Sequence, residues 1–195
     1  NQMWLDGLYM GAAFYAQYGF VMHDTAAFSH VAKQFILAEK HTRNPSSGLL
    51  YHAWDQSKQQ AWAHPTTGQS PYVWGRAMGW YGVALVDALE YFPANHPDKK
   101  TLIDILNRYV EAVVKVQDPK TGLWLDILDV PTAEKNYFEA SASSMFVTVL
   151  FKAVRLGYIN EKYITAAQKG FAGIVQKFVK EENGQVSLQG TVSVS

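Results

Sequence analysis

A single carboxylate stands alone near the start of the chain. Asp6 is the only Asp, Glu, Lys or Arg among the first 23 residues, and apolar side chains flank it. An ionised carboxylate is costly to bury on an apolar helix unless it is paired or faces an opening. Burial among rings would raise the pKa of Asp6, which suits a general acid. The alternatives are a helix cap and a buried partner of an arginine.

An imidazole and a second carboxylate follow in residues 51–55, which read Tyr-His-Ala-Trp-Asp. We interpret this segment as a loop, and loops on a rigid scaffold commonly carry binding and catalytic side chains. His52 and Asp55 are therefore predicted to contact a substrate. The alternatives are a structural histidine for His52 and an Asx turn for Asp55.

A third candidate group contains an arginine between two tryptophans, as Trp74, Arg76 and Trp80. Arg76 and Trp80 are four residues apart and so share one face of a helix. A guanidinium can hold a carboxylate with two hydrogen bonds, and an indole face can stack on a sugar ring or a cation. We predict that these three residues bind substrate. The alternative is tight packing with a structural ion pair from Arg76 to Asp6 or Asp55.

Aromatic residues are unevenly distributed along the chain. Five of the six tryptophans lie in residues 4–80, interleaved with the candidates above. Aromatic platforms, carboxylates and one arginine describe a carbohydrate cleft, and the arginine favours an anionic sugar. Three further segments are weaker candidates. We favour packing for residues 62–64 and 124–126, and a favourable charge at a helix N-terminus for Glu139.

Composition excludes several other classes of function. Lys and Arg total 17, as do Asp and Glu, so no positive field exists for nucleic acid or an anionic membrane. The chain has no cysteine, which removes disulfides, thiolate metal sites and thiol nucleophiles. The histidines are too scattered to indicate a metal site, and no dinucleotide or phosphate-loop fingerprint occurs. We therefore expect no metal, no cofactor and no transmembrane helix.

Periodic apolar residues predict six helices that alternate in kind. Three are apolar on nearly every side, and three carry one apolar stripe and one charged face. A helix that is apolar all round is buried on both sides, whereas a striped helix has one face in water. We therefore expect an inner and an outer layer. The inner helices are predicted at residues 3–20, 74–92 and 138–156, and the outer helices at residues 25–41, 99–116 and 161–180.

A weak repeat accompanies these helices. Glycine turns at residues 47–50, 121–124 and 183–186 each follow an outer helix. Repeated helical hairpins are typical of solenoids and closed toroids. Three hairpins make half of a six-hairpin barrel, so we predict an all-α chain in which residues 1–195 form one partial (α/α)6 catalytic domain. The alternative is an ordinary helical domain with coincidental glycine turns.

The candidate segments resemble, in order and spacing, the unsaturated rhamnogalacturonyl hydrolases of glycoside hydrolase family 105 and the related unsaturated glucuronyl hydrolases of family 88. The resemblance runs through nearly all of the chain. The matching segments are Trp4-Leu5-Asp6-Gly7-Leu8-Tyr9-Met10, His52-Ala53-Trp54-Asp55, Trp74-Gly75-Arg76-Ala77-Met78-Gly79-Trp80 and Asn136-Tyr137-Phe138-Glu139-Ala140-Ser141.

This resemblance implies an (α/α)6 barrel and a metal-free hydrolase that removes a 4,5-unsaturated uronic acid from the non-reducing end of pectin-derived, rhamnogalacturonan oligosaccharides. The family's catalytic acid and base falls on Asp6. Its substrate contacts fall on His52, Arg76 and Trp80, and a supporting wall falls on Trp74. Such a substrate is an enol ether, so one carboxyl group can serve first as acid and then as base. The implied partner is an oligosaccharide, with neither nucleic acid nor membrane.

Two departures from the family bear on these expectations. A second family aspartate lies upstream of the matched region, and the family's C-terminal stretch lies downstream of it. With a start in mid-pattern at Asn1 and a strand-like end at residues 191–195, we expect a fragment. Two other functions stay open, namely a non-catalytic carbohydrate- or partner-binding toroid and a sugar epimerase. The epimerase would use paired histidines, and only His52 is well placed.

Overall fold

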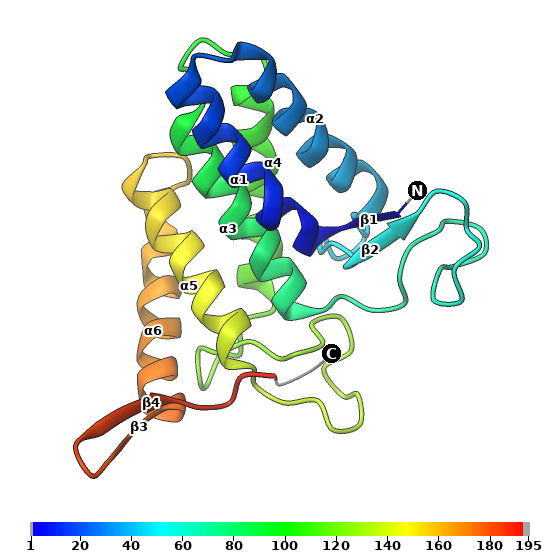
Figure 1. Cartoon of the computed structure of the whole chain (residues 1–195). Coiled ribbons are helices and arrows are strands. Elements are labelled where there is room, and N and C mark those ends of the chain that lie inside the picture. The colour runs from blue at the N-terminus through cyan, green and yellow to red at the C-terminus, as the bar shows by residue number, and fades with distance from the viewer. Residues whose placement is uncertain (1, 193–195) are drawn as a thin grey trace.

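The computed structural model describes residues 2–192, where six α-helices form two layers (Figure 1). Of the strand-like segment 191–195, residues 193–195 lie outside this range. The inner helices α1, α3 and α5 lie side by side and begin at the same end of the molecule. The inner helices are α1 (Leu5–Met22), α3 (Gly75–Tyr91) and α5 (Ala140–Arg155), and the outer helices are α2 (Thr25–Thr42), α4 (Lys99–Lys115) and α6 (Ile164–Phe178). The predicted pairing of inner and outer helices, and the partial barrel, are confirmed.

The first helix begins two residues later than predicted because a short sheet precedes it. Strand β1 (Gln2–Trp4) pairs antiparallel with β2 (Ala53–Asp55). The backbone N–H of Leu5 then donates to the carbonyl of His52 at 3.0 Å. The sheet therefore ties the start of α1 to the loop that carries His52.

The last helix, predicted over about residues 161–180, ends two residues earlier than expected. After the 3₁₀ turn Glu161–Tyr163, α6 ends at Phe178. A hairpin follows, made of β3 (Val179–Glu182) and β4 (Gln185–Leu188). Its turn residues Asn183 and Gly184 have φ angles of 54° and 75°. Positive φ at both positions is what a two-residue hairpin turn requires, and Asn-Gly is its preferred sequence.

The predicted repeat holds at two of its three turns. In residues 44–49 and in residues 118–123, the N–H of the first residue donates to the carbonyl of the sixth, at 2.8 and 2.9 Å. In both turns a glycine at φ 75° donates its N–H to the carbonyl of the first residue at 2.9 Å. The third turn is the β3–β4 hairpin, so this turn motif occurs twice, whereas the pairing of an inner with an outer helix occurs three times in residues 2–192.

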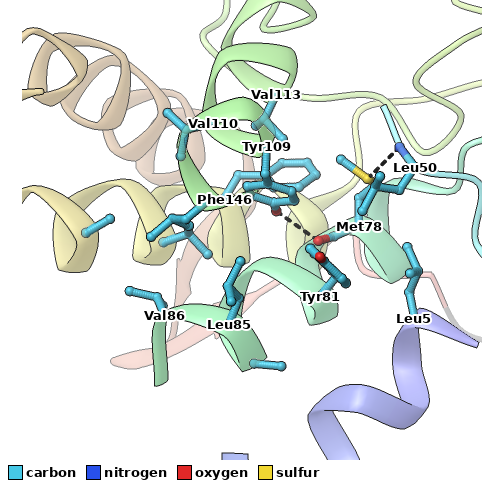
Figure 2. Packing of buried hydrophobic residues seen from close by; sticks show 14 of the residues in the cluster. Leu5, Leu50, Met78, Tyr81, Leu85, Val86, Tyr109, Val110, Val113 and Phe146 are labelled. Carbon is cyan, nitrogen blue, oxygen red and sulfur yellow. Dashed lines mark hydrogen bonds between the residues drawn. The ribbon is translucent and has the colours of Figure 1, made fainter. Parts of the chain in front are cut away.

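The core fixes α3 between its neighbours (Figure 2). The fully buried Tyr109 of α4 packs with Tyr81 and Phe146 and donates its hydroxyl to the carbonyl of Met78 at 2.8 Å. Gly82 makes room for the Tyr109 ring, since a Cβ atom there would lie 2.3 Å from the hydroxyl oxygen. Helix α3 is therefore held tightly, and the residues at its N-terminal end are held with it.

Helix α1 differs from the expectation that inner helices are buried on both sides. Its residues Leu5, Leu8 and Ala16 are buried, but Met10 and Phe14 are 66% and 69% exposed. Within residues 2–192 no other helix covers the face of α1 that carries Met10 and Phe14, because α2 and α3 pack on its other sides. Within the same range, no helix has the length and apolarity needed to cross a membrane.

Candidate active site

Asp6 lies in the first turn of α1, at the end where the inner helices begin (Figure 1). Its side chain is partly buried, and its Oδ2 atom is buried without a hydrogen-bond partner among residues 2–192. Burial raises the pKa of Asp6 above its ordinary value of 3.8. The residue's own backbone N–H and the nearby His52 and Arg76 act in the opposite direction and do not cancel it. A raised pKa is the shift that suits a carboxyl group to act as a general acid.

His52 is oriented by the loop that leads into α3. Its Nδ1 atom lies 3.0 Å from the carbonyl oxygen of Tyr72 and 3.1 Å from the hydroxyl of Ser70. A carbonyl oxygen only accepts, so Nδ1 carries a proton. The ring packs against Trp4 and Trp74, with centroid distances of 5.6 and 6.3 Å. The imidazole is therefore held in one orientation by its Nδ1 contacts and by the two indole rings.

Arg76 is the second residue of α3 and stacks on the residue that caps the same helix. Its guanidinium carbon lies 4.4 Å from the centroid of the Trp74 ring. Its Nη1 atom donates to the carbonyl of Val192 at 3.2 Å, and Trp74 Nε1 donates to Asp126 Oδ1 at 3.0 Å. The guanidinium is thus fixed from two sides.

Arg76 does not form the structural ion pair that sequence left open as its alternative role. Among residues 2–192, the seven ion pairs involve other arginines and lysines, and none joins Arg76 to Asp6 or Asp55. The N-terminal end of a helix also favours negative charge. Helix end and guanidinium together favour binding of an anion, such as a carboxylate.

Trp80 lies one turn further along α3, on the same side as α1. Its ring meets that of Tyr9 with a centroid distance of 4.4 Å and an interplanar angle of 35°. Gly79 beside it faces α5, since a Cβ atom there would lie 2.8 Å from Met145 Cε. Trp80 remains partly exposed and offers an aromatic surface between α1 and α3.

Asp55 points into its own loop rather than toward Asp6. Its carboxylate accepts hydrogen bonds from the hydroxyl and N–H of Ser57 and from the N–H groups of Gln59 and Gln60, at 2.8 to 3.1 Å. Burial opposes ionisation of Asp55, but these hydrogen bonds outweigh it and hold its pKa below the ordinary value. The geometry matches the Asx-turn alternative: Asp55 stabilises residues 56–60.

Two acidic residues for which we predicted other roles also contact the site residues or the segment that binds Arg76. Trp124 is buried and donates to the carbonyl of Val113 at 2.9 Å, as expected for packing, but Asp126 two residues later reaches Trp74. Glu139 is fully buried and caps α5, as expected, and its Oε1 atom also accepts the N–H of Val192 at 3.0 Å. Neither contact has a signal in local spacing, because each joins segments more than 50 residues apart.

Trp62, assigned to packing from sequence, does pack at the edge of this group. Its ring meets that of Trp4 edge-on with a centroid distance of 5.2 Å, and Trp4 is 39% exposed. Residues 2–192 contain no cluster of three or more histidine, aspartate or glutamate side chains placed to hold a metal ion. The side chains brought together here are a carboxyl group with a raised pKa, an imidazole, a guanidinium and aromatic rings.

Comparison with known proteins places this arrangement in a family. The model of Glycosyl Hydrolase Family 88 matches residues 1–195. A family 105 glycoside hydrolase from C. acetobutylicum superposes with a TM-score of 0.97 and 45% identity, over 100% of this chain and 54% of its own. The unsaturated rhamnogalacturonyl hydrolase YesR of Bacillus subtilis is 33% identical over 187 residues, which are 96% of this chain and 49% of that protein.

A relative of more similar length also occurs. Protein Atu3128 of Agrobacterium fabrum is 32% identical over 191 residues, which are 95% of this chain and 81% of that protein. The chain thus spans about half the length of YesR and of the family 105 structure. It belongs to the family 88 and family 105 glycoside hydrolases, and its six helices form part of their α/α barrel.

Proposed function

We propose that this chain carries the catalytic acid of an unsaturated uronyl hydrolase, and that Asp6 is this acid. The observation that carries the proposal is the partly buried Asp6 carboxyl, whose pKa is raised by burial while the imidazole of His52 and the guanidinium of Arg76 lie close enough to act on it. Family membership supports the class of reaction, and YesR supports rhamnogalacturonan-derived oligosaccharides as the substrate class.

The reaction follows from the chemistry of the substrate. In a 4,5-unsaturated uronide the C4–C5 double bond is conjugated with the ring oxygen, so C4 accepts a proton. Protonated Asp6 donates its proton to C4, and positive charge develops at C5 and the ring oxygen. The Asp6 carboxylate then removes a proton from the water that adds to C5. The resulting hemiketal opens, the C1–O bond to the neighbouring sugar breaks, and the acid form of Asp6 is restored.

The other residues bind and orient the substrate in this scheme. Arg76, whose guanidinium lies over the Trp74 ring, binds the C6 carboxylate with two parallel hydrogen bonds. Trp80 stacks on the ring, which the double bond flattens. His52 presents Nε2 to a substrate hydroxyl or to the attacking water. A single carboxyl acting at C4 and C5 differs from the paired carboxylates that attack an anomeric carbon in other glycosidases.

Turnover by wild type and by Asp6→Asn tests the proposal. The substrates are unsaturated disaccharides from lyase digests of rhamnogalacturonan and of a glycosaminoglycan, and the signal is loss of the ultraviolet absorbance of the enol ether. We expect wild type to consume the rhamnogalacturonan product and Asp6→Asn to lose about 10²- to 10⁴-fold in kcat, as for removal of a general acid. Circular dichroism and the melting temperature control for folding.

Each contrary result has a definite meaning. Full turnover by Asp6→Asn would move the acid to another residue. Saccharide binding by wild type without turnover of either substrate would overturn the proposal in favour of a non-catalytic carbohydrate-binding toroid. Preference for the glycosaminoglycan product would keep the reaction and overturn the substrate class.

A further inference from the structure

The Arg76 guanidinium is held between two segments that are remote in sequence. On one side its carbon atom lies 4.4 Å from the Trp74 ring centroid, and on the other its Nη1 atom donates to the Val192 carbonyl at 3.2 Å. A stacked guanidinium keeps its in-plane N–H groups available for a ligand. Whatever fixes the indole and the carbonyl therefore fixes the direction in which Arg76 presents its donors.

Asp126 fixes the indole. Its Oδ1 atom accepts the Trp74 Nε1 proton at 3.0 Å. The backbone of Asp126 is held on both sides, because its carbonyl accepts the N–H of Gly75 at 2.7 Å and its own N–H donates to the carbonyl of Tyr137 at 2.8 Å. The backbone of Asp126 is thus bonded to the start of α3 and to the segment before α5, and its carboxylate is bonded to the indole.

The Asp126 carboxylate bonds to the indole and not to the Arg76 guanidinium. Burial raises the pKa of Asp126, and Glu139 adds to this, while Trp74 and Arg76 act in the opposite direction. Asp126 is therefore close enough to Arg76 to interact with its charge, yet its hydrogen bond goes to the indole. An aspartate paired directly with Arg76 would compete with an anionic ligand, whereas Asp126 orients the arginine through its aromatic support.

Glu139 holds the segment whose Val192 carbonyl contacts Arg76. Its Oε1 atom accepts the N–H of Val192 at 3.0 Å, and the carbonyl of Gly190 accepts the N–H of Ala140 at 2.9 Å. Residues 190–192 are consequently laid across the start of α5, which brings the Val192 carbonyl to Arg76. The Trp74 indole and the Val192 backbone are thus each held by an acidic side chain, Asp126 beside the start of α3 and Glu139 at the start of α5.

We propose that Asp126 is a positioning residue for carboxylate recognition: through the Trp74 indole it holds Arg76 in the orientation that binds a uronide. This inference rests on the proposed function, because it takes Arg76 as the group that binds the substrate carboxylate. It predicts an effect on binding rather than on the chemical step, since Asp126 supports a contact that is made equally in the ground state and the transition state.

Three variants separate positioning from general destabilisation. Asp126→Ala removes the acceptor, whereas Asp126→Asn keeps an oxygen for the indole N–H. Asp129→Ala is the matched control, because Asp129 lies in the same loop and accepts the backbone N–H of Val73 at 3.0 Å, whereas the Trp74 indole donates to Asp126. We expect Asp126→Ala to raise KM about tenfold with kcat within about twofold, which is the size of one lost charge-assisted contact. We expect Asp126→Asn to restore KM to within about threefold of wild type, and Asp129→Ala to leave KM unchanged.

A second readout does not depend on turnover. The indole N–H resonance of Trp74, identified by its loss in Trp74→Phe, reports the hydrogen bond to Asp126. It should move in Asp126→Ala and stay near its wild-type position in Asp126→Asn and Asp129→Ala. If no variant turns over substrate, the proposed function fails while this resonance still decides whether Asp126 orients the indole. An unchanged KM in Asp126→Ala, no rescue by Asp126→Asn, or an equal KM increase in Asp129→Ala would overturn the positioning role.

Discussion

At the scale of single residues, two aspartates show how environment decides chemistry. Asp6 lies in a helix turn where one of its oxygens has no hydrogen-bond partner within residues 2–192, and its pKa is raised. Asp55 accepts hydrogen bonds from Ser57, Gln59 and Gln60, and its pKa is lowered. Burial makes the first carboxyl harder to ionise than a free aspartate, which is the shift that the proposed acid requires. The second favours its ionised form and stabilises a loop.

These opposite shifts predict opposite effects of pH on stability. The folded state of Asp6 binds its proton more tightly than the unfolded state, so the free energy of unfolding falls as pH rises from 3.8 through the folded pKa. Asp6→Asn should therefore be more stable than wild type at neutral pH, and this advantage should shrink as pH falls toward the unfolded pKa. Urea unfolding between pH 4 and pH 8 measures the difference.

Asp55→Asn serves as the control with the opposite sign. Its folded pKa is depressed, so the ionised side chain contributes stability above the unfolded pKa that is lost on acidification. Asp55→Asn should be less stable than wild type at neutral pH and should converge with it in acid. A loss of stability in Asp6→Asn at neutral pH would contradict the account of Asp6 as a destabilised, functional carboxyl.

Some site residues can be identified from sequence and others cannot, for a physical reason. Asp6 and Arg76 stand out because each is a charge within an apolar segment. The roles of Asp126 and Glu139 depend on partners at positions 74 and 192, and a contact between distant segments leaves no local pattern. Asp55 has the same residue type and aromatic neighbours as a binding residue, and only its hydrogen bonds show that it stabilises a turn.

At the scale of elements, glycine positions distinguish close packing from open surface. Gly82 lies in the middle of α3, where an added Cβ atom would lie 2.3 Å from the Tyr109 hydroxyl oxygen. Gly11 lies in the middle of α1 and has no atom within 4 Å of such a Cβ. The same substitution should therefore have opposite effects in two helices of similar length.

Gly82→Ala should destabilise the chain by about 1–3 kcal/mol, as for overpacking in a filled core. Gly11→Ala should be neutral or stabilising by up to about 1 kcal/mol, because alanine has the higher helix propensity. Chemical denaturation of both variants beside wild type checks the pair. Equal stability of Gly82→Ala and wild type would mean that α3 and α4 pack less closely than the structure shows.

Helix positions could be predicted well from sequence, and strands could not. The apolar period placed all six helices to within about three residues of their observed ends, since that period follows directly from helical geometry. The two short sheets were missed because three or four residues carry too little periodicity. The Asn183–Gly184 dipeptide contains the hairpin signal, but the helix predicted to residue 180 overlaps the first two residues of β3.

At the scale of the whole molecule, the layered fold places the candidate site residues at one end. The three inner helices begin together (Figure 1), and each carries one of these residues at its start. Asp6 is the second residue of α1, Arg76 is the second residue of α3 and Glu139 caps α5. Parallel packing of repeated hairpins therefore brings together residues that are about 70 and 60 positions apart in the chain.

The carbon atom of the product that receives hydrogen from the solvent tests most directly whether Asp6 protonates C4. If Asp6 protonates C4, its proton exchanges with solvent before each turnover, so reaction in D₂O places one deuterium at C4 of the released uronic acid product. Proton NMR and mass spectrometry of the product locate the label. We predict a single deuterium at C4 with wild type and no labelled product with Asp6→Asn. Attack at the anomeric carbon would instead first release an unsaturated uronic acid that keeps its C4–C5 double bond. A product sampled early that retains the double bond and carries no deuterium at C4 would therefore contradict the account.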